Sequence, residues 1–497
     1  MKLLTTDDIP LDDCYKPPEG ENGLEENVYE AENMGFSPYD TLETIYYFLK
    51  HLALPATVGL LLPLLFIFGI FENPFFGILG YILSFIAAIL LLSVGREFLR
   101  GLRYKIKKGV IYLPGPYVLK RQAEDYTPTI NKITEPLYKI GFVGDIMKMN
   151  KFDLNFHPDV IKFFEDTDVI IGNLEGVISE KCPTFKQAHE VKILKKLEKL
   201  LPDKKKWLLC LSNNHSEDFS SVIFDQTLQT IQEHPKFDIF GRKQVSSIRN
   251  DENDILISCA TQWSNQKTWR YTFKYNKPIE DNNGNNENND TDDNDDDYIF
   301  SFLKSYKFNI LLPHWGFENE KYVRTRFQDD AEALLTGKEI IPKALKKLYY
   351  KKRNLYKHPI YKWDLIFAHH PHVLQPIMKV RDEIKINKTK TIPYCKLVVF
   401  SAGNFTSGAN IIRKKKHISG IIMKCEIGPL EAYNRKFAIG KMEWRRTKNF
   451  KTRIEDERAK LVCIDNEKYR TYNKPLLISG LFFFIVFLVI YLINLFV

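Results

Sequence analysis

Three uninterrupted apolar runs constrain the fold of this chain more than any other feature. Leu52–Phe71, Phe75–Val94 and Leu476–Val497 contain no charged residue. Each has about 20 residues, the length that crosses the hydrocarbon core of a bilayer, about 30 Å thick. A buried core helix rarely stays apolar on every side over this length. The sequence therefore predicts three transmembrane helices, and the short loop Glu72–Pro74 joins the first two as a hairpin.

Charges around the predicted spans indicate their orientation. The first span follows an acidic tail, and it starts too far into the chain and is too long to be a cleavable signal peptide. Residues 95–108, GREFLRGLRYKIKK, are rich in Arg and Lys, as is the stretch 445–474 before the last span. Since Lys and Arg accumulate in cytoplasmic loops, we expect an integral membrane protein whose soluble domain faces the cytoplasm. The seven scattered cysteines, an odd number, fit reduced thiols there.

The chain is thus expected to have five parts. They are an acidic disordered tail (1–50), the transmembrane hairpin (51–95), a basic linker (96–137), a globular domain (138–470) and a C-terminal transmembrane helix (475–497). Within the domain, residues 280–297 are almost wholly Asn and Asp, which predicts a solvated loop insertion rather than a calcium loop.

The net charge of +9 predicts an anionic partner. For a basic domain beside a membrane, that partner is the lipid bilayer. Nucleic acid is not expected, because no basic segment has the interleaved aromatic residues of a recognition motif. Residues 338–362 combine an apolar stripe with dense basic charge, which fits either a solvated surface helix or contact with the bilayer surface.

Short apolar runs alternate with amphipathic segments through the globular domain. The runs predicted as strands are Lys139–Gly144, Val169–Gly172, Trp207–Leu211, Phe237–Phe240, Ile255–Ser258, Phe308–Pro313, Asp364–Ala368, Leu397–Ser401 and Ile421–Cys425. Several are nearly continuous in Ile, Leu, Val and Phe, as strands covered on both faces are. Helical segments such as Val191–Leu201 and Ile340–Tyr350 lie between them. The alternation predicts a layered α/β fold.

Polar residues with metal-binding side chains follow six of these strands. The motifs are Gly144-Asp145, Asn173–Gly176, Asn213–His215, His314–Glu318, His369–His372 and Ser401–Phe405, and they hold five of the 11 histidines. Ligands of layered α/β folds bind beyond the carboxyl ends of strands. Carboxylate, amide and imidazole groups are ligands of Mn, Fe and Zn. Each motif alone is more often a turn or a structural hydrogen bond than a metal ligand, but the ordered set predicts a metal site.

The order of these motifs resembles that of the calcineurin-like metallophosphoesterase superfamily. Their strings are similar to its CapA branch, the poly-γ-glutamate capsule synthesis proteins, over residues 138–426. This resemblance implies a metallophosphatase-like β-sandwich flanked by helices. Ala368, Ala402 and Ser220 depart from the branch beside the motifs. Met147 stands where the wider superfamily has the His of Asp-x-His, so one metal position lacks that ligand.

The resemblance also implies roles for single residues. The implied metal ligands are Asp145, Glu175, Asn214, His314, His370 and His372, holding one or two divalent cations of the Mn, Fe or Zn class. Glu175 would be the bridging carboxylate. His215 would donate a proton or stabilise the transition state, and Asp218 would either orient that imidazole or serve as a surface or capping residue.

Three further residues have open roles. His369 is expected to support its neighbours rather than bind metal. Asn404 would hydrogen-bond a ligand histidine or a backbone group, with the structural role favoured. Glu318 would fix His314 or touch substrate.

Two functions are consistent with these residues. The first is a membrane-anchored, metal-dependent hydrolase of phosphoester type. The second is a non-catalytic accessory subunit of a poly-γ-glutamate-type polymer synthesis and export complex, whose partners would be other membrane subunits.

Overall fold

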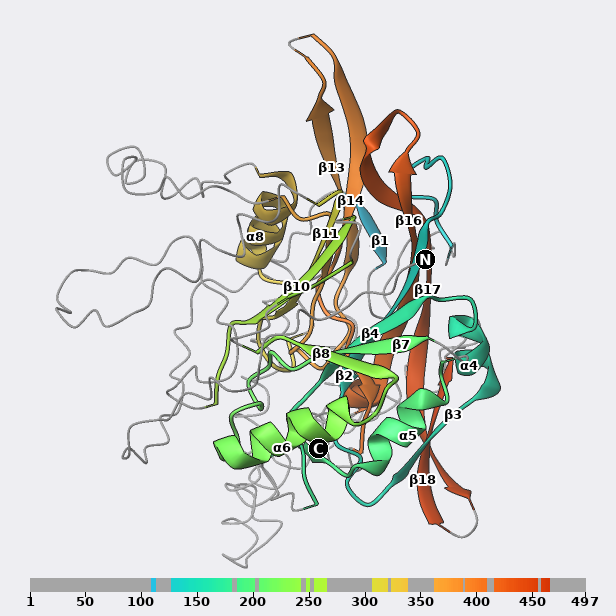
Figure 1. Cartoon of the computed structure of the whole chain (residues 1–497), viewed down its shortest axis with the longest axis vertical. Coiled ribbons are helices and arrows are strands. Elements are labelled where there is room, and N and C mark those ends of the chain that lie inside the picture. The colour runs from blue at the N-terminus through green and yellow to red at the C-terminus, as the bar shows by residue number, and fades with distance from the viewer. Residues whose placement is uncertain are drawn as a thin grey trace, which may run out of the picture. The chain divides into compact units, whose positions relative to one another are not determined.

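A sandwich of two β-sheets forms the part of the chain that the structure, a computed structural model, describes (Figure 1). The described residues are 109–112, 127–180, 186–201, 205–242, 247–250, 254–265, 306–320, 323–337, 362–387, 389–408, 415–454 and 457–464. They all belong to one compact unit.

The larger sheet has nine strands. One half is parallel, and the other is antiparallel except for β3, which pairs in parallel with β18. The parallel half contains β2 (Tyr138–Ile146), β4 (Val169–Leu174), β7 (Lys206–Cys210), β8 (Phe237–Phe240) and β15 (Asn404–Thr406), which pairs with β2. The other half contains β16 (Ser419–Leu430), β17 (Tyr433–Ile454), β18 (Glu457–Ile464) and β3 (Asp153–Phe156). The carboxyl ends of β2, β4 and β7 therefore lie side by side.

The smaller sheet has seven strands in the order β1-β13-β14-β12-β11-β10-β9. Their bounds are β1 (Val110–Tyr112), β9 (Ser247–Arg249), β10 (Ile255–Thr261), β11 (Phe308–His314), β12 (Leu365–Phe367), β13 (Ile377–Lys385) and β14 (Thr391–Val399). The neighbours β10, β11, β12 and β14 are parallel. A separate two-stranded parallel sheet pairs β5 (Val177–Ile178) with β6 (Ala188–His189).

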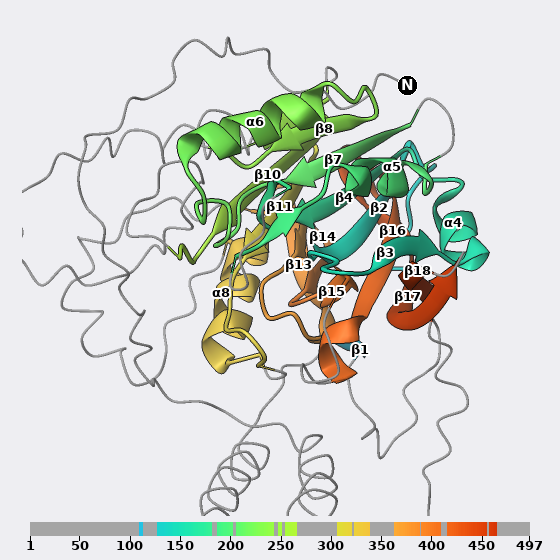
Figure 2. The same cartoon turned by 90° about the horizontal axis from the view of Figure 1, so that it is seen from below.

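Two large hydrophobic cores hold these layers together, beside a smaller cluster of Ile392, Tyr394, Leu430 and Ala438. The first lies between the sheets, where Phe142 of β2 stacks on Phe367 of β12 with ring centroids 5.0 Å apart. The second joins the nine-stranded sheet to α4 (Pro158–Phe164), α5 (Lys192–Glu198) and α6 (Ser221–Gln232). Helix α8 (Thr325–Thr336) packs on the seven-stranded sheet, and Figure 2 shows it apart from the other three helices. A short 3₁₀ turn, Lys415–Ile418, precedes β16.

The predicted α/β fold is confirmed, and each of the nine predicted strands corresponds to an observed strand. The predicted segment Val191–Leu201 contains α5. Parts of the predicted linker also contact the domain, because β1 pairs with β13 and Thr129 bridges to Lys441 of β17.

Several other predictions lie outside the described residues. They are the acidic tail, the three transmembrane helices, the insertion 280–297 and the helix Ile340–Tyr350. Within the described ranges, no helix combines the length and the apolar character needed to span a bilayer.

Candidate metal centre

The two sheets bring the predicted ligands together at the carboxyl ends of their parallel strands. Asp145 is the last residue but one of β2, Glu175 follows β4, and His314 ends β11 of the opposite sheet. One ligand atom from each of these residues lies within 4.8 Å of the other two, and all three side chains are buried. His370 and His372 follow β12 and lie beside them, and with Glu318 they form a second group of this kind. The structure therefore contains residue groups that could hold a metal ion.

Asp145 is held in place by its backbone and by both carboxylate oxygens. Its Oδ1 accepts a hydrogen bond from Asn173 Nδ2 at 2.8 Å, and its Oδ2 lies 3.1 Å from His372 Nδ1. Its backbone N–H donates to Gly403 O at 2.9 Å. Position 144, just before it, requires glycine, because a Cβ on Gly144 would lie 2.2 Å from the same carbonyl oxygen of Gly403. Burial would raise the pKa of Asp145, but the hydrogen bond with His372 and the nearby imidazole charges lower it.

Glu175 is fully buried, and neither of its carboxylate oxygens has a hydrogen-bond partner. The nearest imidazole nitrogens to its Oε1 are His372 Nε2 at 3.3 Å and His215 Nε2 at 3.8 Å. Burial raises the pKa of Glu175. A buried carboxylate whose oxygens make no well-aligned hydrogen bond costs about 1–3 kcal/mol, beyond what the imidazole at 3.3 Å recovers, and a bound cation would offset this cost. The residues around Glu175 thus fit the divalent cation that the motifs imply.

The imidazoles of this centre fall into two electrostatic classes. His370 Nδ1 lies 3.1 Å from His314 Nε2. Burial, followed by the charges of neighbouring imidazoles, lowers the pKa of both side chains well below the ordinary value. They are therefore neutral, which is the form that binds metals. Burial would also lower the pKa of His372, but Glu175 and Asp145 raise it well above its usual value.

The backbone around the histidine pair is strained. His370 has φ +94° and His372 has φ +56°, both in the left-handed region that side chains other than Gly rarely adopt. Such residues cost on the order of 1–3 kcal/mol each and persist where the surroundings hold them. Here the backbone N–H of His370 donates to Asp145 Oδ2 at 3.3 Å, and the His372 ring contacts Asp145 and Glu175, so the strain coincides with the approach of this segment to the two carboxylates.

The two asparagines after β7 have different tasks. Asn213 joins two loops: its Nδ2 donates to Leu174 O at 2.9 Å, and its Oδ1 accepts the backbone N–H of Gly176 at 3.2 Å. Asn214 faces the centre, with its Oδ1 2.9 Å from His314 Nε2. The loop thus presents one amide to the centre and uses the other to hold Glu175 in register.

His215 and Asp218 form a close pair. His215 Nδ1 lies 2.5 Å from Asp218 Oδ2. Because a carboxylate only accepts, Nδ1 carries the proton and Nε2 is the nitrogen directed toward Glu175. His215 is 9% exposed, compared with 1% for His314 and 3% for His370. It is therefore the imidazole best placed to meet a ligand entering from solvent.

Comparison with known families identifies this part of the chain. Residues 139–339 match the family model described as bacterial capsule synthesis protein PGA_cap. Over these residues the chain resembles the CapA-type capsule synthesis proteins. The resemblance expected from the motifs is confirmed over this range, which includes Asp145, Glu175, Asn214 and His314. No curated protein matches the chain.

Outside the matched range, His370, His372 and Asn404 belong to the same centre. Asn404 makes both contacts that the sequence left open, since its Oδ1 lies 3.1 Å from His372 Nδ1 and its Nδ2 donates to His417 O. His369 instead lies 3.3 Å from Val143 O through its Nε2 and belongs to neither group that could hold a metal.

Two supporting residues of the CapA-like domain were missed by sequence reasoning. Asn265, beyond the end of β10, donates from Nδ2 to Asp218 Oδ1 at 3.0 Å and accepts from Asn214 Nδ2 at 3.0 Å. His189 of β6 lies 2.9 Å from Glu175 O through its Nε2, and burial lowers its pKa to about 4. The polar run after β10 was a strand-end signal for Asn265. No motif pointed to His189.

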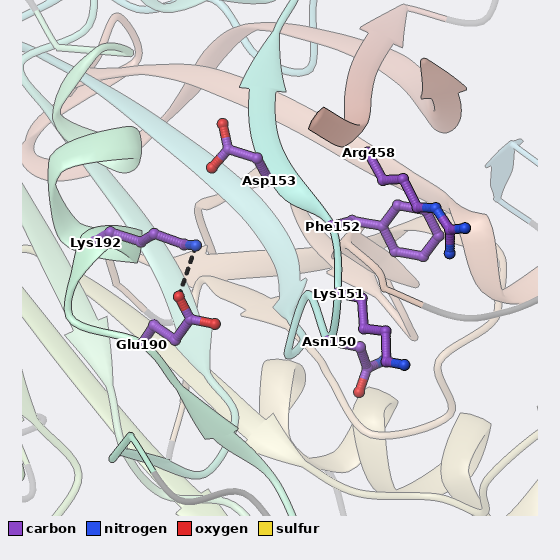
Figure 3. A pocket seen from close by; sticks show the side chains of 7 residues that line it. All are labelled: Asn150, Lys151, Phe152, Asp153, Glu190, Lys192 and Arg458. Carbon is purple, nitrogen blue, oxygen red and sulfur yellow. Dashed lines mark ion pairs between the residues drawn. The ribbon is translucent and has the colours of Figure 1, made fainter. Parts of the chain in front are cut away.

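A separate pocket lies at the surface of the domain (Figure 3). It is lined by Asn150, Lys151, Phe152, Asp153, Glu190, Lys192 and Arg458. Lys192 and Glu190 form an ion pair of 2.6 Å in it. None of the lining residues belongs to the metal centre, and the pocket contains no histidine.

Proposed function

We propose that this protein is a membrane-anchored, CapA-like, metal-dependent hydrolase of phosphoester type. One observation carries the proposal. Glu175 is a fully buried carboxylate whose oxygens accept no hydrogen bond, and it lies between Asp145 and a set of imidazoles. A group of this kind is unfavourable in a purely structural role and favourable as a cation ligand.

Six residues would hold one or two cations of the Mn, Fe or Zn class: Asp145, Glu175, Asn214, His314, His370 and His372. Such a cation supplies Lewis-acid polarisation of a phosphoryl oxygen and lowers the pKa of bound water. The protein aligns these ligands through the strained His370 and His372 backbone and through Asn213. It also limits water around them, because all six side chains are buried.

His215 is the proposed catalytic proton donor. Its Nε2 points toward the centre, and Asp218 accepts a hydrogen bond from Nδ1. Asp218 thereby fixes the ring orientation and would stabilise the positive charge of a protonated ring. Asn265 donates to the other carboxylate oxygen and so restrains Asp218. Asp218 is on this view a positioning residue.

The deciding experiment measures metal and turnover in the same full-length preparation. We expect bound Mn²⁺ and chelator-sensitive hydrolysis of simple phosphomonoesters or phosphodiesters. Asp145→Ala and His370→Ala should each lower Mn²⁺ affinity and the rate of hydrolysis by at least about 100-fold. Replacing a residue that only supports a metal ligand already costs about 10–100-fold. Asp159→Ala, an exposed carboxylate of α4, is the matched control. Metal-free wild type, or turnover unchanged in both variants, would exclude the hydrolase.

A non-catalytic accessory subunit of a capsule-polymer synthesis and export complex is the second candidate. The description of the matched family, a capsule synthesis protein, favours it. So does Met147, which is buried at the position where the wider superfamily has a metal-binding histidine. Its partners would be other membrane subunits. Bound metal without turnover of any phosphoester would favour this candidate over the hydrolase.

We further propose that three transmembrane helices anchor the domain at the cytoplasmic face of a bilayer. The support is the charge-free runs 52–71, 75–94 and 476–497 and the basic segments beside them. The full-length chain should stay with the membrane fraction in alkaline carbonate, and detergent should release it. Release by carbonate alone would contradict the spans.

A further inference from the structure

The surface pocket of Figure 3 contains two carboxylates, and both are already paired with lysines. The cavity measures about 320 Å³, at the lower end of the range for small-molecule sites, about 300–1,000 Å³. Figure 3 shows the Lys192–Glu190 ion pair on one side of it and Lys151 and Arg458 on the other. The second carboxylate, Asp153, pairs with Lys196 at 2.5 Å. Neither carboxylate is therefore left to balance the remaining cations of the pocket.

Lys151 and Arg458 are these remaining cations. Both are exposed, and within the ranges that the structure describes neither side chain makes an ion pair or a hydrogen bond. They come from distant segments, the loop between β2 and β3 and the start of β18. The parallel pairing of Ala459 in β18 with Asp153 in β3 brings the two segments together. The fold thus places two unpaired cations at one cavity.

Two further lysines lie against the ring of Phe152, which lines the pocket. Lys460 Nζ is 4.9 Å from the ring centre and Lys451 Nζ is 5.7 Å from it. These lysines are direct partners in the antiparallel pair β17–β18, where like charges opposite each other are unfavourable. Burial, and then the charge of Lys451, lower the pKa of Lys460. An anion in the pocket would reduce this repulsion.

The backbone on both sides of the cavity is anchored. Phe152 N–H donates to Met149 O at 3.1 Å and closes a turn that contains Asn150 and Lys151. Asn150 has φ +56°, a conformation that Asn adopts more readily than most residues, and its Nδ2 donates to Gly408 O at 3.1 Å. Arg458 belongs to the paired strand β18. Little backbone freedom is therefore lost when a ligand binds between them.

We propose that this pocket binds a phosphate group through Arg458 and Lys151. A guanidinium matches two phosphate oxygens at once, and an ammonium adds a point charge. A phosphate monoester carries about −1.5 to −2 charges at pH 7, which suits two unpaired cations better than the single charge of a carboxylate. The group belongs either to a soluble phosphorylated molecule or to a lipid headgroup. The pocket shares no residue with the metal centre, so this inference goes beyond the proposed function and does not depend on it.

The test is calorimetric titration of the full-length chain in detergent, with a chelator present so that the metal centre is empty. Inorganic phosphate should bind wild type saturably. Arg458→Gln and Lys151→Gln should each weaken this binding by roughly 10–100-fold, the usual contribution of a hydrogen bond to a charged group. Arg435→Gln is the matched control, because Arg435 is an exposed arginine near the other end of β17. It removes the same charge and should keep the wild-type affinity.

A second pair of probes distinguishes the two sources of the phosphate. Dihexanoyl phosphatidic acid and glycerol 3-phosphate carry the same phosphomonoester with and without acyl chains. Tighter binding of the lipid, lost in Arg458→Gln, would support a headgroup as the ligand, and equal binding of both would support a soluble phosphate.

Two results would overturn the proposal. One is wild type that binds no phosphate in chelator, and the other is equal weakening in Arg458→Gln and Arg435→Gln, which would reflect general positive charge. Mn²⁺-dependent phosphoester hydrolysis is a separate readout and should be unchanged in Arg458→Gln. Its absence from wild type would exclude the proposed hydrolase and leave the phosphate pocket standing.

Discussion

Replacing Glu175 by glutamine is expected to abolish Mn²⁺ binding and to lower phosphoester hydrolysis by at least about 100-fold. The substitution keeps the size of the side chain but removes the negative charge from the buried centre. Among the described buried carboxylates of the centre, Glu175 is the one whose oxygens make no well-aligned hydrogen bond, whereas both oxygens of Asp145 have partners. A neutral amide in the same place cannot balance a divalent cation, even with Asp145 and the imidazoles unchanged.

Thermal unfolding gives a readout of this variant that does not depend on turnover. For wild type, Mn²⁺ at 100 times its Kd should stabilise the folded state by about 2.7 kcal/mol. In a domain of this size, that free energy raises Tm by roughly 5 °C. Glu175→Gln should show no Mn²⁺-dependent shift.

Glu180→Gln is the control for this substitution, because Glu180 lies nearby in sequence and is exposed. It should retain the full shift. A Mn²⁺-dependent shift of wild-type size in Glu175→Gln would mean that the buried carboxylate is not a ligand.

His215→Asn is expected to separate chemistry from metal binding. Proton transfer by a positioned side chain contributes about 10²–10⁴-fold, so kcat should fall within this range. Bound Mn²⁺ should stay at the wild-type level, because His215 belongs to neither group that could hold a metal. Asp218→Asn should lower kcat less, since it removes the acceptor that orients Nδ1 at 2.5 Å but leaves the imidazole in place.

The control for this pair is His234→Asn. His234 is partly exposed, follows α6 and contacts Glu198, away from the centre. It should leave both metal content and kcat unchanged. If His215→Asn lost Mn²⁺ in proportion to activity, His215 would be a metal-binding or structural residue, and its assignment as the proton donor would be wrong.

How well the strands could be predicted depended on how they are covered. Strands such as β4 and β11 are covered on both faces, so every position in them is buried. In the sequence they therefore appear as nearly continuous apolar runs. In β13, exposed Lys379, Arg381, Glu383 and Lys385 alternate with residues that are buried or half-buried, because one face of the strand is exposed. Its period of two residues was a strand signal, but it contains no continuous apolar run of the kind that predicted the other strands. The long basic strand β17 was missed for the same reason.

The sequence by itself determined the chemical types at the strand ends. The residue types at the strand ends, from Asp145 to His372, are set by the sequence whatever the tertiary structure. In a layered α/β fold, the carboxyl ends of parallel strands lie at one edge of the sheet. For this reason the ligand types and the family resemblance could be predicted from local strings.

Only the tertiary structure decided which of these residues meet. His372 contacts Asp145 across 227 positions, and Asn265 contacts His215 and Asp218 from a loop that no motif marked. His189 at the Glu175 carbonyl and Glu318 beside the histidine pair are further cases. The physical reason is that these contacts depend on how two sheets face each other and on how their loops are anchored. Neither property is encoded in the residues next to the contact.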